Sequence, residues 1–276
     1  MNSEIKKNLA SNWFKTLQET FCEDINKLEK NKVKFKSTIW KINVKKDEGG
    51  GEYRVLQNGK IFEKVGVNFS TVYGKFPKQF QKNILGAHKD PRFWASGISV
   101  VMHMKTPVIA AMHFNTRYVC TTQDWFGGGI DVTPCLEFDV EKEKFHKNLR
   151  IMCDKHNTDY YPKFKKWCDE YFFIKHRNEP RGIGGIFFDY LNEGDSKSEF
   201  DFVKEVGMFF HNYVDDIIER KKNKKWDDHD KTRQLVKRGR YAEFNLLYDR
   251  GTKFGLETGG NVEAILMSMP PQASWE

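Results

Sequence analysis

The residue types with the most catalytic potential in this chain lie in two short polar segments. They are Ser99, His103, His113, Asn115 and Arg117. Because successive side chains of a strand point to opposite faces, the spacing in each segment keeps its polar residues on one face. A hairpin turn centred near Thr106 would set Ser99 opposite His113 and bring all five side chains onto one face of a sheet. Such a face could bind a polar or anionic ligand and exchange a proton with it.

A solvent-facing strand with scattered polar residues is the simpler interpretation of these segments. The neighbouring apolar residues argue against it, because they alternate as well. They are Val108, Ala110, Met112 and Phe114. One face of the second segment is therefore suited to a core, and the opposite polar face is patterned in a way that favours a binding site.

Helices and strands that would position these segments are predicted in separate blocks. A helix is expected over residues 9–30, and the dipeptide Asn58-Gly59 is a strong hairpin signal between two strands. Further strands are expected near residues 53–56, 61–69, 186–190 and 241–248. Three further helices are expected: one near residues 139–156 with Asp139 as its N-cap, one that starts at Pro162, and one over residues 198–220. Since strands and helices do not alternate, the pattern predicts an α+β fold, a large antiparallel sheet flanked by helices, in a single domain over residues 1–276.

Composition narrows the class of protein. The 276 residues are 39% hydrophobic and 14% aromatic, which suffices for a domain with a sizeable core. No apolar run reaches the ~18 residues of a spanning helix, and the first residues lack the apolar centre of a signal peptide. The five cysteines form an odd set without a Cys-x-x-Cys pair. We therefore expect a reduced, cytoplasmic protein with no membrane span.

The net charge of +8 raises the question of a nucleic-acid partner. Its best support is two basic runs, Lys221–Lys225 and Lys237–Arg240. Basic and acidic residues are interleaved along most of the chain, however, and a small anionic ligand would also use this charge. We therefore expect an anionic small molecule and no nucleic acid.

Two glycine-rich stretches could be mistaken for nucleotide-binding loops. Residues 181–185 run into a strand pattern, whereas a dinucleotide fingerprint follows a strand and opens a helix. Residues 127–129 lack the Lys-Ser/Thr of a phosphate loop. Three consecutive glycines there would allow either close approach of the backbone to a flat ligand or a bend that aims Asp131.

Six long motifs together resemble the oxygen-dependent coproporphyrinogen III oxidases. They are residues 66–70, 125–134, 161–178, 181–189, 239–251 and 265–271. The resemblance covers nearly the whole chain in order, and motifs of this length are specific.

This resemblance implies the oxidative decarboxylation of two propionates of coproporphyrinogen III to vinyl groups, giving protoporphyrinogen IX in heme synthesis. Dioxygen would accept the electrons, and carbon dioxide and hydrogen peroxide would be the other products. It also implies a homodimer, a large antiparallel sheet flanked by helices, and no organic cofactor. A tetrapyrrole-binding protein without catalysis is the alternative, although His113 and Asp131 are both present.

The resemblance also assigns roles to individual residues. His113 would act as the acid/base group, Asp131 would face the pyrrole nitrogens, and Arg117 would clamp a propionate. The implied substrate contacts are Ser99, Asn115, Thr116, Arg117, Gly259, Gly260 and Asn261. Further propionate candidates, each equally suited to a structural ion pair, are Arg177, Arg181, Arg240 and Arg250. Two departures from the resemblance stand out. Asn261 replaces an arginine that is usual in the family. The resemblance also leads us to expect a further C-terminal segment, and the sequence given ends at Glu276.

A divalent metal site is a second question that the resemblance raises. The implied ligands are His103, His113, His146 and His176. Their spacings of 10, 33 and 30 residues form no short metal motif, so buried structural histidines are the competing interpretation for His146 and His176. A metal-dependent hydrolase built on these histidines is a third functional class, and it would not explain the long motifs.

Overall fold

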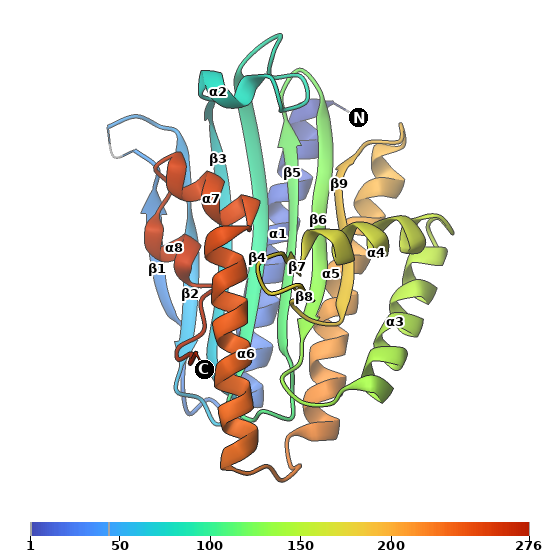
Figure 1. Ribbon diagram of the computed structural model, residues 1–276. Coiled ribbons are helices and arrows are strands. Elements are labelled where there is room, and N and C mark those ends of the chain that lie inside the picture. The colour runs from blue at the N-terminus through green and yellow to red at the C-terminus, as the bar shows by residue number, and fades with distance from the viewer. Residues whose placement is uncertain (1, 44, 276) are drawn as a thin grey trace.

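A seven-stranded antiparallel sheet runs through the centre of the protein, whose structure is a computed structural model describing residues 2–43 and 45–275 (Figure 1). The strands in spatial order are β1 (Lys36–Lys41), β2 (Gly49–Gln57), β3 (Phe62–Lys75), β4 (Arg92–Met104), β5 (Ala111–Cys120), β6 (Asp124–Thr133) and β9 (Gly184–Leu191). A separate small hairpin is formed by β7 (Phe173–Ile174) and β8 (Glu179–Pro180). The α+β architecture predicted from the sequence is confirmed.

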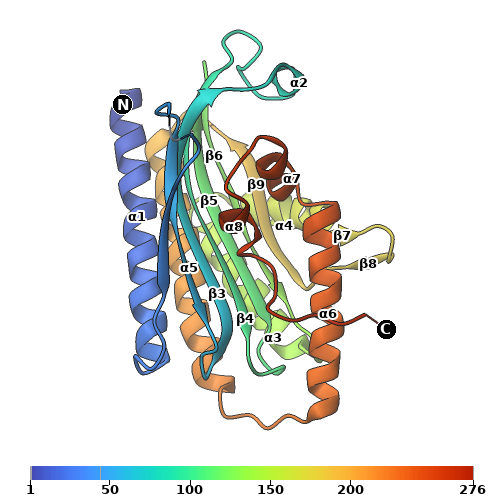
Figure 2. The ribbon, with the colours of Figure 1, turned by 90° about the vertical axis from the view of Figure 1, so that its left-hand side faces the viewer.

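Helices cover both faces of this sheet (Figure 2). They are α1 (Ser3–Leu28), α2 (Lys78–Gln81), α3 (Asp139–Asp154), α4 (Tyr160–Tyr171), α5 (Ser196–Lys221), α6 (Asp228–Leu247), α7 (Arg250–Glu257) and α8 (Val262–Leu266). The long helices α1 and α5 lie side by side on one face, whereas α6, α7 and α8 stand over the other (Figure 2). No helix in the described part of the chain is both long and apolar enough to cross a bilayer.

The main core lies between the sheet and the pair α1 and α5. Phe14, Leu17, Phe21 and Ile25 recur at helical spacing along α1 and are each at most 1% exposed. Burying side chains of this size stabilises the fold by about 1.5–3 kcal/mol each. The sheet contributes the alternate residues of its strands to this core, so the opposite set of side chains is left for other uses.

The pairing of β4 with β5 confirms the shared polar face but corrects the predicted register. Ser99 lies opposite Asn115, not His113, and Val101 lies opposite His113. The connection spans residues 105–110 instead of a tight turn at Thr106. Side-chain hydrogen bonds from Gln234 on α6 to the carbonyls of Met104 and Thr106, at 2.9 and 3.2 Å, help to hold this wider loop. Such distant contacts are not visible in a local sequence pattern.

Two other local predictions are wrong. Residues 241–248 were expected to form a strand, but residues up to Leu247 belong to α6. A capping box between Asp227 and Asp230 starts this helix, and Arg238, Tyr241 and Asn245 are buried at helical spacing. Tertiary burial of this face therefore outweighs the strand preference of the aromatic residues.

The start of α3 also differs from the prediction. Phe138 occupies the N-cap position and makes no side-chain capping bond, so Asp139 is the first residue inside the helix. A carboxylate in the first turn still interacts favourably with the helix dipole. The hairpin between β2 and β3 is confirmed, although its connection spans residues 58–61 and is not a two-residue turn. Asn58 has the left-handed conformation, with φ of 60°.

Candidate active site

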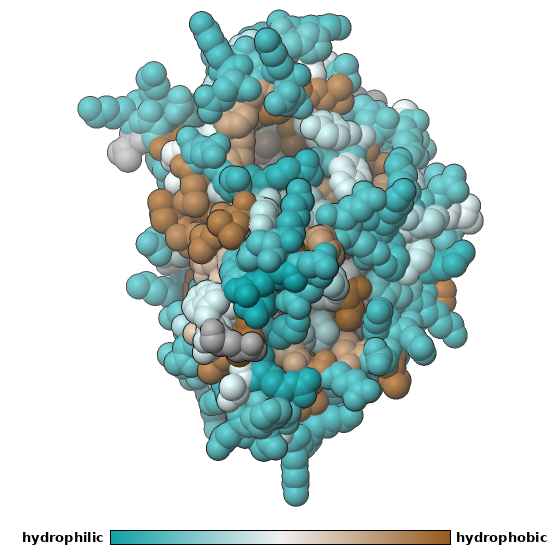
Figure 3. All heavy atoms as spheres, in the orientation of Figure 1, coloured by the Kyte–Doolittle hydropathy of each residue, from teal (hydrophilic) through white to brown (hydrophobic). Residues whose placement is uncertain are grey.

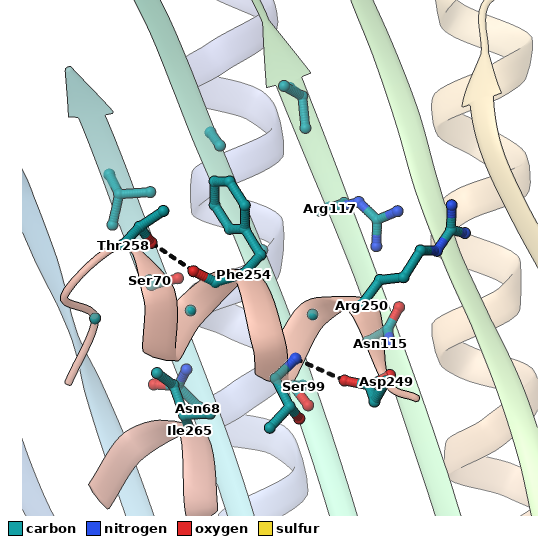
Figure 4. A pocket seen from close by; sticks show the side chains of 18 of the residues that line it. Asn68, Ser70, Ser99, Asn115, Arg117, Asp249, Arg250, Phe254, Thr258 and Ile265 are labelled. Atoms are coloured by element: carbon teal, nitrogen blue, oxygen red, sulfur yellow. Dashed lines mark hydrogen bonds between the residues drawn. The ribbon is translucent and has the colours of Figure 1, made fainter. Parts of the chain in front are cut away.

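A cavity of about 750 Å³ lies on the sheet face that α6, α7 and α8 cover. This volume is typical of pockets for small organic molecules. Side chains of β3, β4, β5 and β9 form its floor, and residues of α7 and α8 form its cover (Figure 4). Apolar side chains gather on the outer surface over this cover (Figure 3). Leu256 of α7 and Val262 of α8 are 39% and 49% exposed.

The strand register arranges the floor in rows that cross the sheet. Asn68, Ser99 and Asn115 lie directly opposite one another on β3, β4 and β5. Two residues before Asn115 on the same strand, His113 of β5 pairs with Asp131 of β6. Residues in such a row have their side chains on the same face and close together. The fold therefore brings polar groups from separate strands to one surface.

His113 is held from behind by Asp131. Its Nδ1 lies 2.7 Å from Asp131 Oδ1, and its Nε2 lies 3.3 Å from the Asn115 amide nitrogen. Nδ1 therefore donates to the Asp131 carboxylate. His113 lines the cavity, with its Nε2 beside the Asn115 amide.

Arg181 completes this arrangement on the other carboxylate oxygen. Its guanidinium donates to Asp131 Oδ2 and, at 2.7 Å, to Asn245 Oδ1. Both Arg181 and Asp131 are 3% exposed. Burial alone would raise the pKa of the Asp131 carboxyl, but the charge of Arg181 and the bonds from His113 and Arg181 outweigh it and lower the pKa. Asp131 is therefore ionised.

Three aromatic rings surround the Arg181 guanidinium. The guanidinium carbon lies 4.1 Å from the ring centroid of Phe172, 4.5 Å from that of Tyr241 and 4.8 Å from that of Phe244. Such cation–π contacts partly offset the cost of burying the charge. Arg181 also lines the cavity, and its Nε has no hydrogen-bond partner within the described chain.

Asp131 itself does not line the cavity. His113 and Arg181 stand in front of it and occupy its two oxygens. The expected contact of Asp131 with pyrrole nitrogens stays a prediction. In the structure the carboxylate binds His113 and Arg181.

Arg117 points into the cavity from β5 and pairs with Asp189 of β9 at 2.8 Å (Figure 4). The glycine at position 127 makes room for this pair. A Cβ added to Gly127 would lie 2.6 Å from Asp189 Oδ1 and 3.0 Å from two Arg117 nitrogens. Residues 127–129 lie within β6 and do not line the cavity, so they make no close approach to a ligand there. The pairing of β6 with β9 is irregular between Phe126 and Gly128, which agrees with the predicted local bend.

The four further arginine candidates separate into two pairs. Arg181 and Arg250 line the cavity, and the Arg250 guanidinium lies over the rings of Tyr171 and Phe187. Arg177 and Arg240 lie outside it and pair with carboxylates, Arg177 with Glu243 and Arg240 with Glu179 and Glu243. Only the first pair is positioned for a ligand.

The other predicted substrate contacts differ in their placement. Ser99, Asn115, Thr116, Gly260 and Asn261 line the cavity. Thr116 is fully buried, and alternation directs its side chain to the face packed on the helices, so only its backbone can reach a ligand. Gly259 is not among the lining residues.

The four histidines expected to hold a metal do not come together. Each of them already has a partner. His103 Nε2 lies 2.9 Å from the Ser268 carbonyl, His146 contacts the Ile183 carbonyl and the Tyr161 hydroxyl, His176 contacts Tyr248 and Glu243, and His113 contacts Asp131. Of the four, only His113 lines the cavity. This donor set therefore does not fit a shared metal ion.

The one group of metal-ligand type in the described residues lies elsewhere. Asp227, His229 and Asp230 meet at the start of α6, where Asp227 and Asp230 already form the capping box. The group is remote from the predicted histidines in sequence and largely exposed.

Sequence reasoning missed several polar residues of the cavity. Asn68 and Ser70 line it, as do Tyr241, Asn245 and Asp249. The signal for the first two was present, since both lie in the motif of residues 66–70, and alternation puts them on the same face. Asn245 and Tyr241 were hidden by the wrong strand prediction for their segment.

Comparison with known sequences agrees with the resemblance carried by the motifs. A profile of the family described as coproporphyrinogen III oxidase matches residues 9–276. A protein of Rickettsia bellii named oxygen-dependent coproporphyrinogen-III oxidase is 51% identical over 276 residues, which cover 98% of this chain and 99% of the relative. A protein of the same name from Rickettsia akari is 50% identical, and the match covers 98% of this chain and 98% of the relative. One from Rickettsia rickettsii is 49% identical, and the match covers 100% of each chain. These relatives have no long segment outside the alignment, so the expected C-terminal extension is not a feature of them.

Proposed function

The chain belongs to the coproporphyrinogen III oxidase family, and we propose from this premise how its cavity acts on a porphyrinogen. The enzyme is an oxidoreductase of heme biosynthesis that converts two propionates of coproporphyrinogen III to vinyl groups with dioxygen as oxidant. In each step a propionate loses carbon dioxide and a β-hydrogen. The two electrons and two protons that remain reduce one dioxygen to hydrogen peroxide.

His113 is the proton-transfer group in this proposal. His113 lines the cavity, Nδ1 is fixed by Asp131, and Nε2 becomes an acceptor for the ligand when the Asn115 amide moves away from it. A neutral imidazole in this position could remove a proton as the vinyl group forms, an effect typically worth ~10²- to 10⁴-fold in rate. The observation that carries the proposal is this orientation of His113 at the floor of the cavity. Asp131 acts through His113 as a positioning residue.

Arg117 and Arg250 bind carboxylates of the substrate. Both guanidiniums lie at the same end of the cavity (Figure 4), where they could hold the reacting edge of the macrocycle by charge-assisted hydrogen bonds. Arg181 also lines the cavity, but Asp131 and Asn245 already bind its terminal nitrogens. Ser99, Asn115, Gly260 and Asn261 supply neutral contacts on the remaining walls.

Several finer features belong to the same proposal. Residues 1–276 would act as one catalytic domain in a cytoplasmic homodimer, in line with the resemblance. Free thiols at all five cysteines suit a reducing compartment. Dioxygen is the co-substrate, and no divalent metal or organic cofactor takes part.

The test is aerobic incubation of the purified protein with freshly reduced coproporphyrinogen III, followed by chromatography of the oxidised porphyrins. We expect protoporphyrin to form through a monovinyl intermediate with three propionates, with one peroxide per vinyl group. His113→Asn should lower kcat by ~10²-fold or more. His211→Gln, on the opposite face beside Asp24, is the matched control and should retain activity. Binding of the substrate without turnover would instead indicate a tetrapyrrole-binding protein without catalysis.

A further inference from the structure

A strongly cationic segment, residues 75–92, runs from the end of β3 to the start of β4. It has five cationic side chains and one acidic side chain, so it carries half of the net charge of +8. The cationic residues, all exposed, are Lys75, Lys78, Lys82, Lys89 and Arg92. Of the five, only Arg92 forms an ion pair with a carboxylate in the described chain, that of Asp90. The four lysines therefore present unpaired charge to solvent.

This segment forms part of the rim of the cavity. Lys75, Phe76, Pro77 and Ile84 line the cavity. With α2, the segment extends beyond the end of the sheet on the side where α7 lies (Figure 2). Hydrophilic side chains gather at this end of the molecule (Figure 3). A ligand that enters the cavity beside the segment therefore passes its lysines first.

The apolar side chains of the segment are turned to the protein instead. The ring centroid of Phe80 lies 5.2 Å from that of Phe254 on α7, and the ring of Phe76 stacks on Phe93 with centroids 4.3 Å apart. Leu85, 36% exposed, is the one large apolar side chain of the segment that is exposed. A segment that enters a bilayer interface exposes a broader apolar face. This surface is therefore suited to a small anion in solution.

The arginines inside the cavity act over a shorter range than these lysines. Arg117 pairs with Asp189 at 2.8 Å, and Arg181 pairs with Asp131. The field of each such pair is largely cancelled at a distance. An unpaired lysine acts over about a Debye length, ~10 Å at 0.1 M salt. The two sets of cations thus suit different stages of binding, the approach and the final contact.

We propose that residues 75–92 form an electrostatic capture surface, which attracts the polycarboxylate substrate and guides it to the cavity. Lys78, Lys82 and Lys89 act through their charge on the encounter and make no contact with the reacting groups. Fixed charge of one sign beside a cleft raises association rates by ~10- to 10³-fold, and salt reduces the effect. The inference rests on the proposed function, which supplies a ligand with four carboxylates.

The experiment separates association from chemistry by removing dioxygen. Without its oxidant the enzyme binds coproporphyrinogen III but does not convert it, so stopped-flow fluorescence of Trp40 and Trp125, which line the cavity, reports binding alone. The association rate constant is measured between about 20 and 500 mM NaCl, over which the Debye length falls severalfold. Aerobic kcat is measured for the same proteins.

Two triple variants that lose the same amount of charge are compared with the wild type. The capture-surface variant combines Lys78→Gln, Lys82→Gln and Lys89→Gln. The control variant changes three exposed lysines in the loop between α5 and α6, at the opposite end of the molecule (Figure 2). Its substitutions are Lys222→Gln, Lys224→Gln and Lys225→Gln.

The wild-type association rate constant should fall at least about tenfold over this range of salt. At low salt the capture-surface variant should associate about fivefold more slowly than the wild type, with a weaker salt dependence and unchanged kcat. The control variant should behave as the wild type. Equal association rates of the two variants, or a wild-type rate that salt does not alter, would overturn the inference.

Two further results have distinct meanings. Co-sedimentation with phosphatidylglycerol vesicles of the wild type but not of the capture-surface variant, with equal association rates for the substrate, would assign the surface to a membrane and overturn the inference. Failure of the wild type to form vinyl groups in air would refute the proposed function, whatever the association rates show.

Discussion

Asp131 illustrates, at the scale of the residue, how burial decides a role. A carboxylate with both oxygens occupied by His113 and Arg181 has no remaining access to the cavity. We therefore propose that its effect on a ligand passes through these two side chains. In this proposal Asp131 orients the imidazole and does not contact the pyrrole nitrogens.

Replacement of Asp131 by asparagine tests this description. The amide cannot hold His113 in the same tautomer, so we expect kcat to fall by ~10²- to 10⁴-fold while KM changes little. Steady-state kinetics over a range of pH provides the measurement, because an altered tautomer also changes the pH profile. A large rise in KM with kcat preserved would contradict the positioning role and indicate direct contact with substrate.

The sequence identified the polar residues of the floor but not their partners. His113, Asn115 and Arg117 could be placed on one face from alternation alone, and the structure has them there. Arg181 is 50 residues from Asp131, and no local pattern links the two. Pairing at such distances depends on the packing of β6 against the segment before β9, which periodicity cannot supply.

At the scale of the element, β6 shows why a strand can require glycine. Gly127 lies beside the ion pair of Arg117 and Asp189, and a methyl group there would displace it. The pair in turn determines where the Arg117 guanidinium points. The glycine is therefore required by a neighbouring side chain and not by its own backbone conformation.

Gly127→Ala should raise KM for coproporphyrinogen III by about tenfold, because the displaced guanidinium loses one charge-assisted bond to a carboxylate. The background Arg117→Ala provides the control. Once the arginine is gone, the added methyl group should have little further effect on KM, so the two changes should be strongly non-additive. Additive effects in the double variant would show that Gly127 acts by another route.

The strand β4 is also tied to the C-terminal part of the chain. Buried His103 donates from Nε2 to the carbonyl of Ser268, and Lys64 of β3 donates to that of Met269. Burial, and then the charges of Arg238 and Lys64, lower the pKa of His103 to about 3, against the hydrogen bond to Ser268, which raises it. The imidazole is therefore neutral in the folded protein.

This neutral His103 predicts a loss of stability in acid. Between the usual histidine pKa of about 6.5 and the folded value of about 3, the unfolded chain binds a proton that the folded protein excludes. The stabilisation is thus complete above pH 6.5 and falls, by at most about 1.4 kcal/mol per pH unit, as the pH decreases through this window. Urea unfolding at several pH values should show a shallower decline for His103→Gln than for the wild type. His229→Gln, at an exposed position, is the control, and an unchanged slope in His103→Gln would contradict the assignment.

The elements that the sequence predicted poorly are those whose burial is decided by distant contacts. The helices over residues 3–28 and 196–221 have clear apolar stripes and were expected from them. The C-terminal half of α6 has an aromatic, alternating sequence, and its helical state depends on burying Arg238, Tyr241 and Asn245 against the sheet. Local propensity therefore failed where polar residues form the buried face.

At the scale of the whole molecule, the sheet separates stability from chemistry. One face is packed on α1 and α5 and forms the main core, while the other carries the cavity (Figure 2). A strand residue whose side chain faces α1 and α5 therefore contributes to the core, whereas the next residue along the strand faces the cavity and can contact a ligand. This division explains why alternation along β4 and β5 could be interpreted from sequence, and why the cover of α7 and α8 could not.

The same architecture keeps the four candidate metal ligands apart. His103 and His113 lie on β4 and β5, His146 lies on α3, and His176 lies in the β7–β8 hairpin loop, each with its own hydrogen-bond partners. Gathering them around one ion would require breaking these bonds and moving separate layers of the fold.

We therefore expect protein treated with a strong chelator, with metal content well below one ion per chain, to retain its kcat and KM for coproporphyrinogen III. Metal content is measured by mass spectrometry on the sample used for kinetics, and an untreated sample and one with metal restored are the controls. Loss of activity on chelation, with recovery at one equivalent of a divalent ion, would show that the histidines rearrange or that another site, such as Asp227, His229 and Asp230, has a catalytic role.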